Sequence, residues 1–261
     1  MQRGTPRLLT ETATGRLSVR QVFPPRRALA RGRGAMLIVA VALAAFAAIL
    51  FLVRRNRSQA LDLRITRHIQ RIEGPRFNRL MQIVSWPGFP PQSRLIPPAL
   101  ALVWLALGFP IEAAFQLLAW GVAGISAGIK FAVRRPRPAA ADVRIAPARI
   151  GGTSFPSGHV LIYAGVYGFL AFLINTLVRP ALPRRVANLM LISLIGLVGP
   201  SRVYLGHHWF TDVFASYLLG SSYLLALMAI YRRVKTRWVN QRLARLRSRS
   251  ANPDQRIEER A

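Results

Sequence analysis

Residues 35–53 read AMLIVAVALAAFAAILFLV, a run without a single charged side chain. An α-helix rises 1.5 Å per residue, so this run is about 28 Å long and can cross the hydrocarbon layer of a bilayer. Arginines flank it on both sides, at positions 31 and 33 before it and at 54, 55 and 57 after it. A cleavable signal peptide is the alternative, but the leader is long and the apolar run exceeds a usual signal core. We therefore predict a retained transmembrane helix.

Further apolar runs follow, separated by proline, glycine or charged residues. With the first run they predict spans at 35–53, 95–109, 111–131, 158–178, 186–199 and 210–231. The fifth is expected to end at the Gly199-Pro200 step, a pair that disfavours helix. The predicted fold class is all-α, a polytopic membrane helix bundle of about six transmembrane helices. The chain divides into a basic disordered tail (1–34), a membrane-embedded domain (35–231) and a basic C-terminal tail (232–261).

The segment 54–94 is rich in arginine and mixed in hydrophobicity. Leu61, Ile65, His68 and Ile69 recur near helical spacing, which predicts a basic amphipathic helix at the membrane surface. The Trp86-Pro87 step ends this helix. His68 belongs to no catalytic constellation, so we expect a structural or surface position for it.

The composition excludes several function classes. Hydrophobic residues make up 52% of the chain and charged residues only 18%, whereas a soluble domain carries about a quarter charged residues. The balance of 37 basic to 9 acidic residues would suit a nucleic-acid binder. However, most arginines lie between or beyond the apolar runs, where they contact anionic lipid headgroups. We therefore predict basic tails on a lipid surface and no nucleic-acid partner. The absence of cysteine excludes thiolate metal sites and a cysteine nucleophile.

The distribution of basic residues also predicts an orientation. Six spans place both termini on one side of the membrane, where the tails and the 179–185 connection carry 21 basic residues, against 16 on the opposite side. Basic residues accumulate on the cytoplasmic side, so we predict cytoplasmic termini.

Polar residues cluster in three segments: Lys130 to Pro138, Pro156 to His159, and Ser201 to Asp212. The first two lie between the third and fourth spans, and the last lies between the fifth and sixth. Both connections follow an odd-numbered span, so they emerge on the same side of the membrane whichever way the chain is inserted. We therefore expect the three segments to meet at one membrane face.

These segments have a definite pattern. The first reads KFAVRRPRP, with Lys130 seven positions before Arg137; the second reads PSGH, ending at His159; the third is Ser201-Arg202, five residues, His208, three residues and Asp212. In order and spacing they resemble the motifs of the type 2 phosphatidic acid phosphatase superfamily, in its membrane branch. The resemblance implies a lipid phosphate or pyrophosphate phosphatase that acts through a phosphohistidine, without metal or other cofactor.

Five residues suit the binding of the phosphoryl group. Phosphoryl transfer spreads negative charge over the equatorial oxygens, so catalysis depends on positioning and compensating charge. Lys130, Arg137 and Arg202 supply cations. The Ser157 hydroxyl and the amides of Ser157 and Gly158 can donate to the same oxygens, and Gly158 allows close backbone approach.

The remaining motif residues suit the covalent chemistry. His208 is the expected nucleophile. Asp212 lies four positions later, on the same helix face, where its carboxylate can keep one ring nitrogen protonated. By the resemblance, His159 protonates the leaving alkoxide and later activates water.

Several neighbours of the motifs receive no catalytic role. Spacing to the other motif residues selects His208 over His207. Arg134 and Arg135 add positive potential only, and Trp209 is expected to anchor at the headgroup level.

The substrate and the exact reaction stay open at the level of sequence. Phosphatidic acid, phosphatidylglycerol phosphate and undecaprenyl pyrophosphate are all candidates, and the last two presume a bacterial host. We predict a protein of the bacterial inner membrane whose site faces the periplasm or exterior, because the termini are expected to be cytoplasmic. A lipid phosphotransferase is the nearest alternative, since another hydroxyl can replace water. A non-catalytic lipid transporter is a second, although transport needs no nucleophile–orienter pair. Vanadium haloperoxidases have similar motifs, but they are soluble proteins, and the six predicted spans argue against that class.

Overall fold

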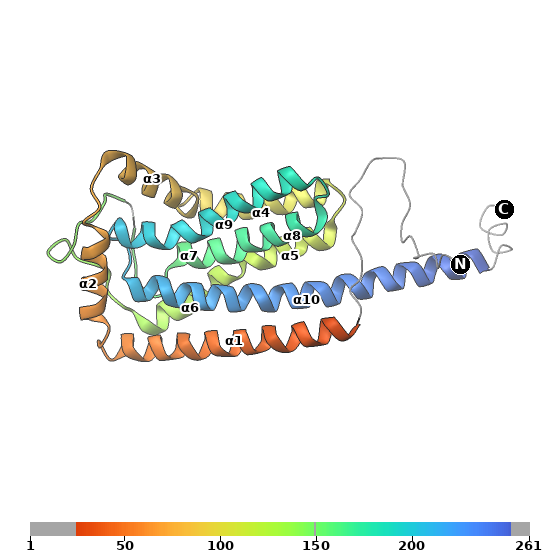
Figure 1. Cartoon of the computed structure of the whole chain (residues 1–261), viewed down its shortest axis with the longest axis horizontal. Helices are drawn as coiled ribbons and strands as arrows, with labels where there is room; N and C mark the ends of the chain where they lie inside the picture. Colours follow the sequence, from red (N-terminus) through yellow and green to blue (C-terminus); the bar gives the residue numbers. More distant parts are fainter. Residues whose placement is uncertain (1–24, 149, 252–261) are drawn as a thin grey trace.

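The computed structural model describes residues 25–148 and 150–251, and every regular element in this part of the chain is helical (Figure 1). The elements are α1 (Pro25–Arg54), α2 (Gln59–Ile69), α3 (Pro75–Ser85), the 3₁₀ turn η1 (Trp86–Gly88), α4 (Gln92–Ala106), α5 (Pro110–Trp120), α6 (Val122–Val133), α7 (Gly158–Ile162), the π turn η2 (Tyr163–Tyr167), α8 (Gly168–Leu177), α9 (Ala181–Tyr204) and α10 (Phe210–Ala251). The all-α prediction is confirmed.

Among the described residues, five helical stretches are long and apolar enough to cross a membrane: Gly34–Arg54, Pro110–Val133, Gly158–Leu177, Ala181–Tyr204 and Phe210–Ala244. They correspond to five of the predicted spans. The sixth, predicted at 95–109, is α4, whose 15 residues give only about 22 Å of helix. It packs along α5 and follows the long axis of the bundle (Figure 1). The chain is thus a polytopic membrane bundle.

The two predicted tails are described only in part. Residues 1–24 and 252–261 lie outside the described residues. Helix α1 begins at Pro25, before the predicted start of the first span, and α10 continues beyond residue 231 to Ala251.

Large apolar side chains cover the outside of the bundle as well as its core. Met36, Leu37 and Val41 of α1 are more than 60% exposed, although α1 packs along α10. In water such a surface would be unfavourable, but lipid tails are as apolar as these side chains. Inside, Phe115, Phe169 and neighbouring residues form one of the buried apolar clusters. This distribution is that of an integral membrane protein.

The prediction that α9 ends at Gly199-Pro200 is wrong, since the helix continues to Tyr204. Pro200 has no N–H, which leaves the carbonyl of Gly196 without its usual donor. The hydroxyl of Tyr217 on α10 enters this gap: it lies 2.6 Å from the Ile195 oxygen and 3.1 Å from the Gly196 oxygen, and it accepts the Gly199 N–H at 2.9 Å. A Cβ at residue 199 would lie 2.5 Å from the Tyr217 ring, so glycine makes room for it.

This arrangement predicts the effect of Tyr217→Phe. The substitution removes the hydroxyl that serves the broken ladder, so we expect a loss of stability of about 1–3 kcal/mol, measured as a lower Tm in detergent. Tyr204→Phe is the matched control, because no hydrogen bond of the Tyr204 hydroxyl occurs among the described residues. Equal Tm values for the two variants would contradict the assignment.

Candidate active site

The three polar segments meet at one end of the bundle (Figure 1). Lys130 lies in the last turn of α6, and Arg137 lies in the connection that follows. His159 lies in the first turn of α7, Arg202 in the last turn of α9, and Asp212 in the first turn of α10. The site is therefore built from helix ends, which the bilayer forces to one boundary.

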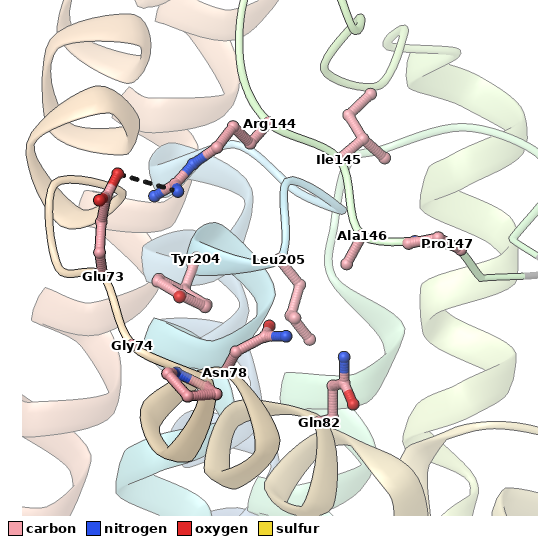
Figure 2. Close-up of a pocket in the computed structure, with 11 residues that line it drawn as sticks. Glu73, Gly74, Asn78, Gln82, Arg144, Ile145, Ala146, Pro147, Tyr204 and Leu205 are labelled. Atoms are coloured by element: carbon pink, nitrogen blue, oxygen red, sulfur yellow. Dashed lines mark hydrogen bonds and ion pairs between the residues drawn. The ribbon is translucent and has the colours of Figure 1, made fainter.

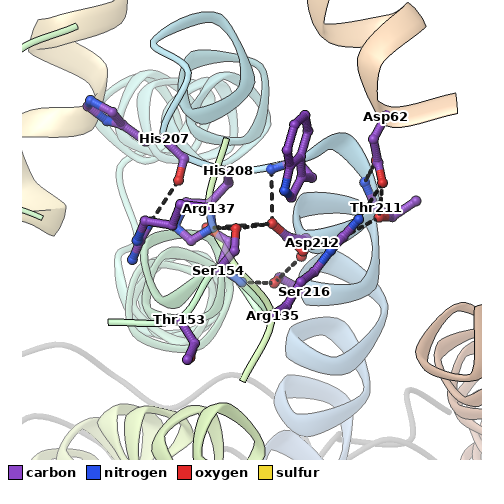
Figure 3. Close-up of polar contacts among 12 residues, drawn as sticks. Asp62, Arg135, Arg137, Thr153, Ser154, His207, His208, Thr211, Asp212 and Ser216 are labelled. Atoms are coloured by element: carbon purple, nitrogen blue, oxygen red, sulfur yellow. Dashed lines mark hydrogen bonds and ion pairs between the residues drawn. The ribbon is translucent and has the colours of Figure 1, made fainter. Parts of the chain in front are cut away.

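His208 lies at the centre of these contacts and is buried. Its Nε2 is 3.2 Å from Nη1 of Arg137, and its Nδ1 is 3.6 Å from Oδ2 of Asp212 and 3.5 Å from Oγ of Ser154 (Figure 3). A guanidinium has donors only, so Nε2 is the acceptor and the proton lies on Nδ1. This tautomer places the lone pair of the ring on Nε2, where it accepts from Arg137 in the structure.

Both adjacent histidines are held neutral. Burial, followed by the charges of Arg202, Arg137 and Lys130, lowers the pKa of His208 well below its ordinary value of 6.5. Burial also lowers the pKa of His207 to about 4. His207 Nε2 lies 2.9 Å from the carbonyl oxygen of Ala146, so this imidazole holds the 144–147 segment.

Asp212 is fixed by donors on both of its oxygens. Nη1 of Arg135 donates to Oδ1 at 2.6 Å, while the Trp209 N–H (2.9 Å) and the Ser154 hydroxyl donate to Oδ2. Arg135 and Ser154 were not predicted as site residues, because neither has a distinctive spacing to the motifs. The placement of Trp209 at the headgroup level is wrong: the residue is buried, and its indole N–H donates to the Pro136 oxygen at 3.1 Å.

Arg202 is completely buried but only partly paired. Its Nη1 donates to the Ser85 hydroxyl at 3.3 Å and its guanidinium lies 4.9 Å from the centre of the Phe89 ring. Within the described residues, Nε and Nη2 of Arg202, the hydroxyl of Ser157 and Nε2 of His159 have no hydrogen-bond partner. Buried polar atoms without partners are rare in proteins, and an anion would satisfy the arginine and serine donors.

Lys130 and Arg137 lie beside this cluster and also hold the chain around it. Lys130 Nζ donates to the Thr153 oxygen at 2.7 Å. Arg137 donates to the His207 oxygen at 2.7 Å and to the oxygens of Gly151 and Gly152 at 3.2 Å. Both predicted cations therefore lie near His208, and both bind backbone carbonyl oxygens of the segments around it.

The predicted roles of Ser157 and Gly158 are modified by their contacts. The Ser157 amide donates to Ser216 Oγ at 2.7 Å, so only the hydroxyl of this residue is free. A Cβ at Gly158 would meet Ser126 Oγ at 3.8 Å, an ordinary contact. Packing within the protein therefore does not require glycine at position 158.

Helix α2 lies across the site end of the bundle (Figure 1), and its buried side chains are polar. Ser58, Asp62, Thr66 and Gln70, spaced by four positions, are buried, whereas Leu61 is 50% exposed. His68 is exposed, as predicted. The helix predicted around Leu61–Ile69 is present as α2, but it does not continue to Trp86-Pro87, because α3 is a separate helix. The inward face of α2 is polar.

A groove of about 460 Å³ opens beside the site, between α3 and the 144–147 segment (Figure 2). Its lining includes Glu73, Asn78, Tyr204 and Arg144, the last of which lies 3.4 Å from Glu73. None of the predicted site residues lines it. The groove is therefore distinct from the centre around His208.

Comparisons with known proteins agree with this architecture. Residues 111–236 match the model of the PAP2 superfamily. The chain is 28% identical over 173 residues to phosphatidylglycerophosphatase B of Bacillus subtilis (strain 168), covering 64% of this chain and 82% of that protein. The crystal structure of a transmembrane PAP2 type phosphatidylglycerolphosphate phosphatase from Bacillus subtilis superposes with a TM-score of 0.60 and 25% identity, over 75% of this chain and 96% of that one.

Aquifex aeolicus LpxE shares the fold, with a TM-score of 0.52 and 21% identity over 65% of this chain and 95% of that one. The matched segment of the family model runs from α5 into α10 and contains all three polar motifs. Residues 111–236, which carry all three motifs, belong to the PAP2 superfamily, and the protein is an integral membrane phosphatase.

Proposed function

We propose that the protein hydrolyses a lipid phosphate through a phosphohistidine on His208. The observation that carries this proposal is the state of the imidazole: it is buried and neutral, it has an acceptor lone pair on Nε2, and it lies among incompletely paired cations. Such a group can attack phosphorus while the surrounding cations compensate the charge of the phosphoryl oxygens.

The reaction proceeds in two steps with His159 as the proton carrier. In the first, the Nε2 lone pair of His208 forms a bond to phosphorus, the bond from phosphorus to the lipid oxygen breaks, and His159 gives its proton to that oxygen. In the second, His159 removes a proton from water as the water oxygen attacks phosphorus and the N–P bond breaks. Asp212 stabilises the positive charge on the imidazole in between. Lys130, Arg137, Arg202, Ser157 and Gly158 bind the phosphoryl oxygens.

Phosphatidylglycerol phosphate is the first substrate to test, because the Bacillus subtilis relative is named for this activity. Phosphatidic acid and undecaprenyl pyrophosphate present the same chemistry on other anchors. A membrane-embedded site receives such a substrate by lateral diffusion, with its phosphate already at the boundary where the cations lie.

We infer further that the termini are cytoplasmic and that the site faces the periplasm or exterior of a bacterial inner membrane. The excess of basic residues on the side of the termini supports this orientation. We propose that the arginines of α10 beyond Tyr231 contact anionic headgroups on the side of the termini.

The first prediction concerns His208→Ala. We expect loss of phosphate release of at least about a thousandfold with intact membrane insertion, and loss of the acid-labile, alkali-stable phosphoenzyme that the wild-type protein forms with labelled substrate. His159→Ala should keep forming this phosphoenzyme with an aryl phosphate, whose leaving group needs no proton, and should accumulate it. The assay is a phosphate-release panel over lipid monophosphates and pyrophosphates, with and without chelator.

The same panel separates the alternatives. A phosphotransferase would transfer label to added glycerol in preference to water. A transporter would release no phosphate from any lipid and would move lipid equally well without His208. Full turnover by His208→Ala would contradict the proposed nucleophile.

The second prediction concerns the protonation of His208. A lowered pKa means that the imidazole is neutral well below pH 6.5 and gains its proton only at lower pH. Nitrogen NMR of histidine-labelled protein in detergent, assigned with His208→Ala, should show a neutral ring at pH 6.5 with the proton on Nδ1. Arg137→Gln removes a neighbouring positive charge and should raise the pKa. A ring half-protonated at pH 6.5 in the wild-type protein would contradict the site's electrostatics.

The third prediction concerns orientation, and the cysteine-free chain makes its test simple. Glu73 is exposed at the site end, and Arg185 is exposed near the start of α9, toward the opposite end (Figure 1). In spheroplasts, a membrane-impermeant maleimide should label Glu73→Cys directly but Arg185→Cys only after permeabilisation. The reverse pattern would place the active site in the cytoplasm.

A further inference from the structure

A second cluster of charges lies on the Nδ1 side of His208, the proposed nucleophile. Asp62 of α2 and Asp212 of α10 are both fully buried. The guanidinium of Arg135 lies between them: Nη2 donates to Asp62 Oδ2 at 2.6 Å and Nη1 donates to Asp212 Oδ1 at 2.6 Å (Figure 3). Two carboxylates share one guanidinium, so the cluster carries one net negative charge beside His208.

The same carboxylate of Asp62 also holds the helix that carries Asp212. Oδ1 of Asp62 accepts the Thr211 N–H at 2.8 Å and Oδ2 accepts the Thr211 hydroxyl at 2.9 Å. The first N–H groups of a helix have no partner inside it, so a side chain of α2 caps α10 at the turn that contains Asp212. A carboxylate is also favoured at the positive end of the helix dipole.

The charge balance of the cluster explains why two carboxylates are present. Arg135 and Asp212 alone would form a neutral pair, which would do little for the imidazolium that develops when His208 attacks. Asp62 compensates the charge of Arg135, so that Asp212 acts on His208 with an uncompensated negative charge. The net charge of the cluster then matches, with opposite sign, the charge that forms on the ring.

We propose that Asp62 and Arg135 are positioning residues of the phosphatase reaction. Arg135 holds Asp212 in place against His208, and Asp62 offsets the charge of Arg135 so that Asp212 stabilises the imidazolium. This inference rests on the proposed role of His208 as nucleophile. Neither residue contacts the phosphoryl group.

The test is a cycle of charge changes: Asp62→Asn, Arg135→Gln and the double variant, with kcat and KM measured on the same lipid phosphate. Asp62→Asn keeps the size of the side chain but leaves the cluster neutral, so kcat should fall by about tenfold or more while KM stays within about twofold. Arg135→Gln alone leaves two carboxylates without compensation and should lower both stability and kcat. The double variant restores one net negative charge, so its kcat should exceed that of Asp62→Asn by about threefold or more.

A merely structural role predicts the opposite order, because the double variant loses more hydrogen bonds than either single variant. A double variant no faster than Asp62→Asn would therefore overturn the inference. The double variant also decides the case if Asp62→Asn does not fold: recovery of folded, active protein supports charge balance, and a failure of the double variant to fold overturns it.

Glu112→Gln is the matched control. Glu112 is an equally buried carboxylate, bound to Lys235 Nζ at 2.7 Å and to the Tyr231 hydroxyl at 2.7 Å. Tyr231 lies about 28 Å along α10 from Asp212, so this substitution should lower Tm and leave kcat unchanged. A comparable fall of kcat in Glu112→Gln would show that any loss of a buried carboxylate has this effect and would overturn the inference.

His208→Ala, measured in the same series, separates the two levels of the argument. If it retains turnover, the proposed function fails. If it is inactive while Asp62→Asn turns over at the wild-type rate, the proposed function stands and only the positioning role fails.

Discussion

A charge that is removed from water must find a partner, and the core of a bilayer offers no water to serve as one. At the site end of this protein, buried charge falls into two groups. Asp62, Arg135 and Asp212 satisfy one another with contacts of 2.6 Å. Arg202, also fully buried, keeps two nitrogens without a partner among the described residues. Burying an incompletely paired guanidinium costs several kcal/mol in general, and in the proposed function the phosphate of the substrate removes this cost. The first group of charges holds the side chains beside His208 in position. The second is the proposed binding site of the phosphoryl oxygens.

The membrane also determines where such groups are found. Within the hydrocarbon layer the backbone must be helical, so irregular connections collect at the helix ends. The connection after α6 and the short one between α9 and α10 lie at the same end of the bundle (Figure 1), and α2 fastens them there. Gln70 Nε2 donates to the Arg144 oxygen at 2.7 Å and to the Tyr204 oxygen at 2.9 Å, while its Oε1 accepts the Arg144 N–H. The helix that lies across the bundle end thus supplies hydrogen-bond partners to the backbone of these connections.

Features that depend on neighbouring residues in the sequence were predicted. Features that depend on contacts between distant residues were missed. The spans were predictable from the apolar runs. The proximity of His208 and Asp212 was predictable from their spacing of four positions. The continuation of α9 past Pro200 depends on Tyr217, which lies on the next helix. The burial of Asp62 depends on Thr211, 149 positions away, and no periodicity within α2 reveals it. Apolar periodicity located α2 but did not reveal its buried face for the same reason: the surface that α2 covers is polar, and that surface is assembled from distant residues.

The two groups of charge act on His208 in opposite directions. Burial, followed by the cations Arg202, Arg137 and Lys130, opposes protonation of the ring and holds its pKa low, so the Nε2 lone pair is unprotonated in the free enzyme. In the proposed mechanism the ring becomes positive once it bonds to phosphorus, and the phosphoryl oxygens then compensate those cations. The field that remains at the ring is that of the carboxylates, 3.6 Å away at Asp212. A single imidazole can therefore be a free nucleophile before the attack and a stabilised cation after it, because the arriving phosphate changes which set of charges dominates.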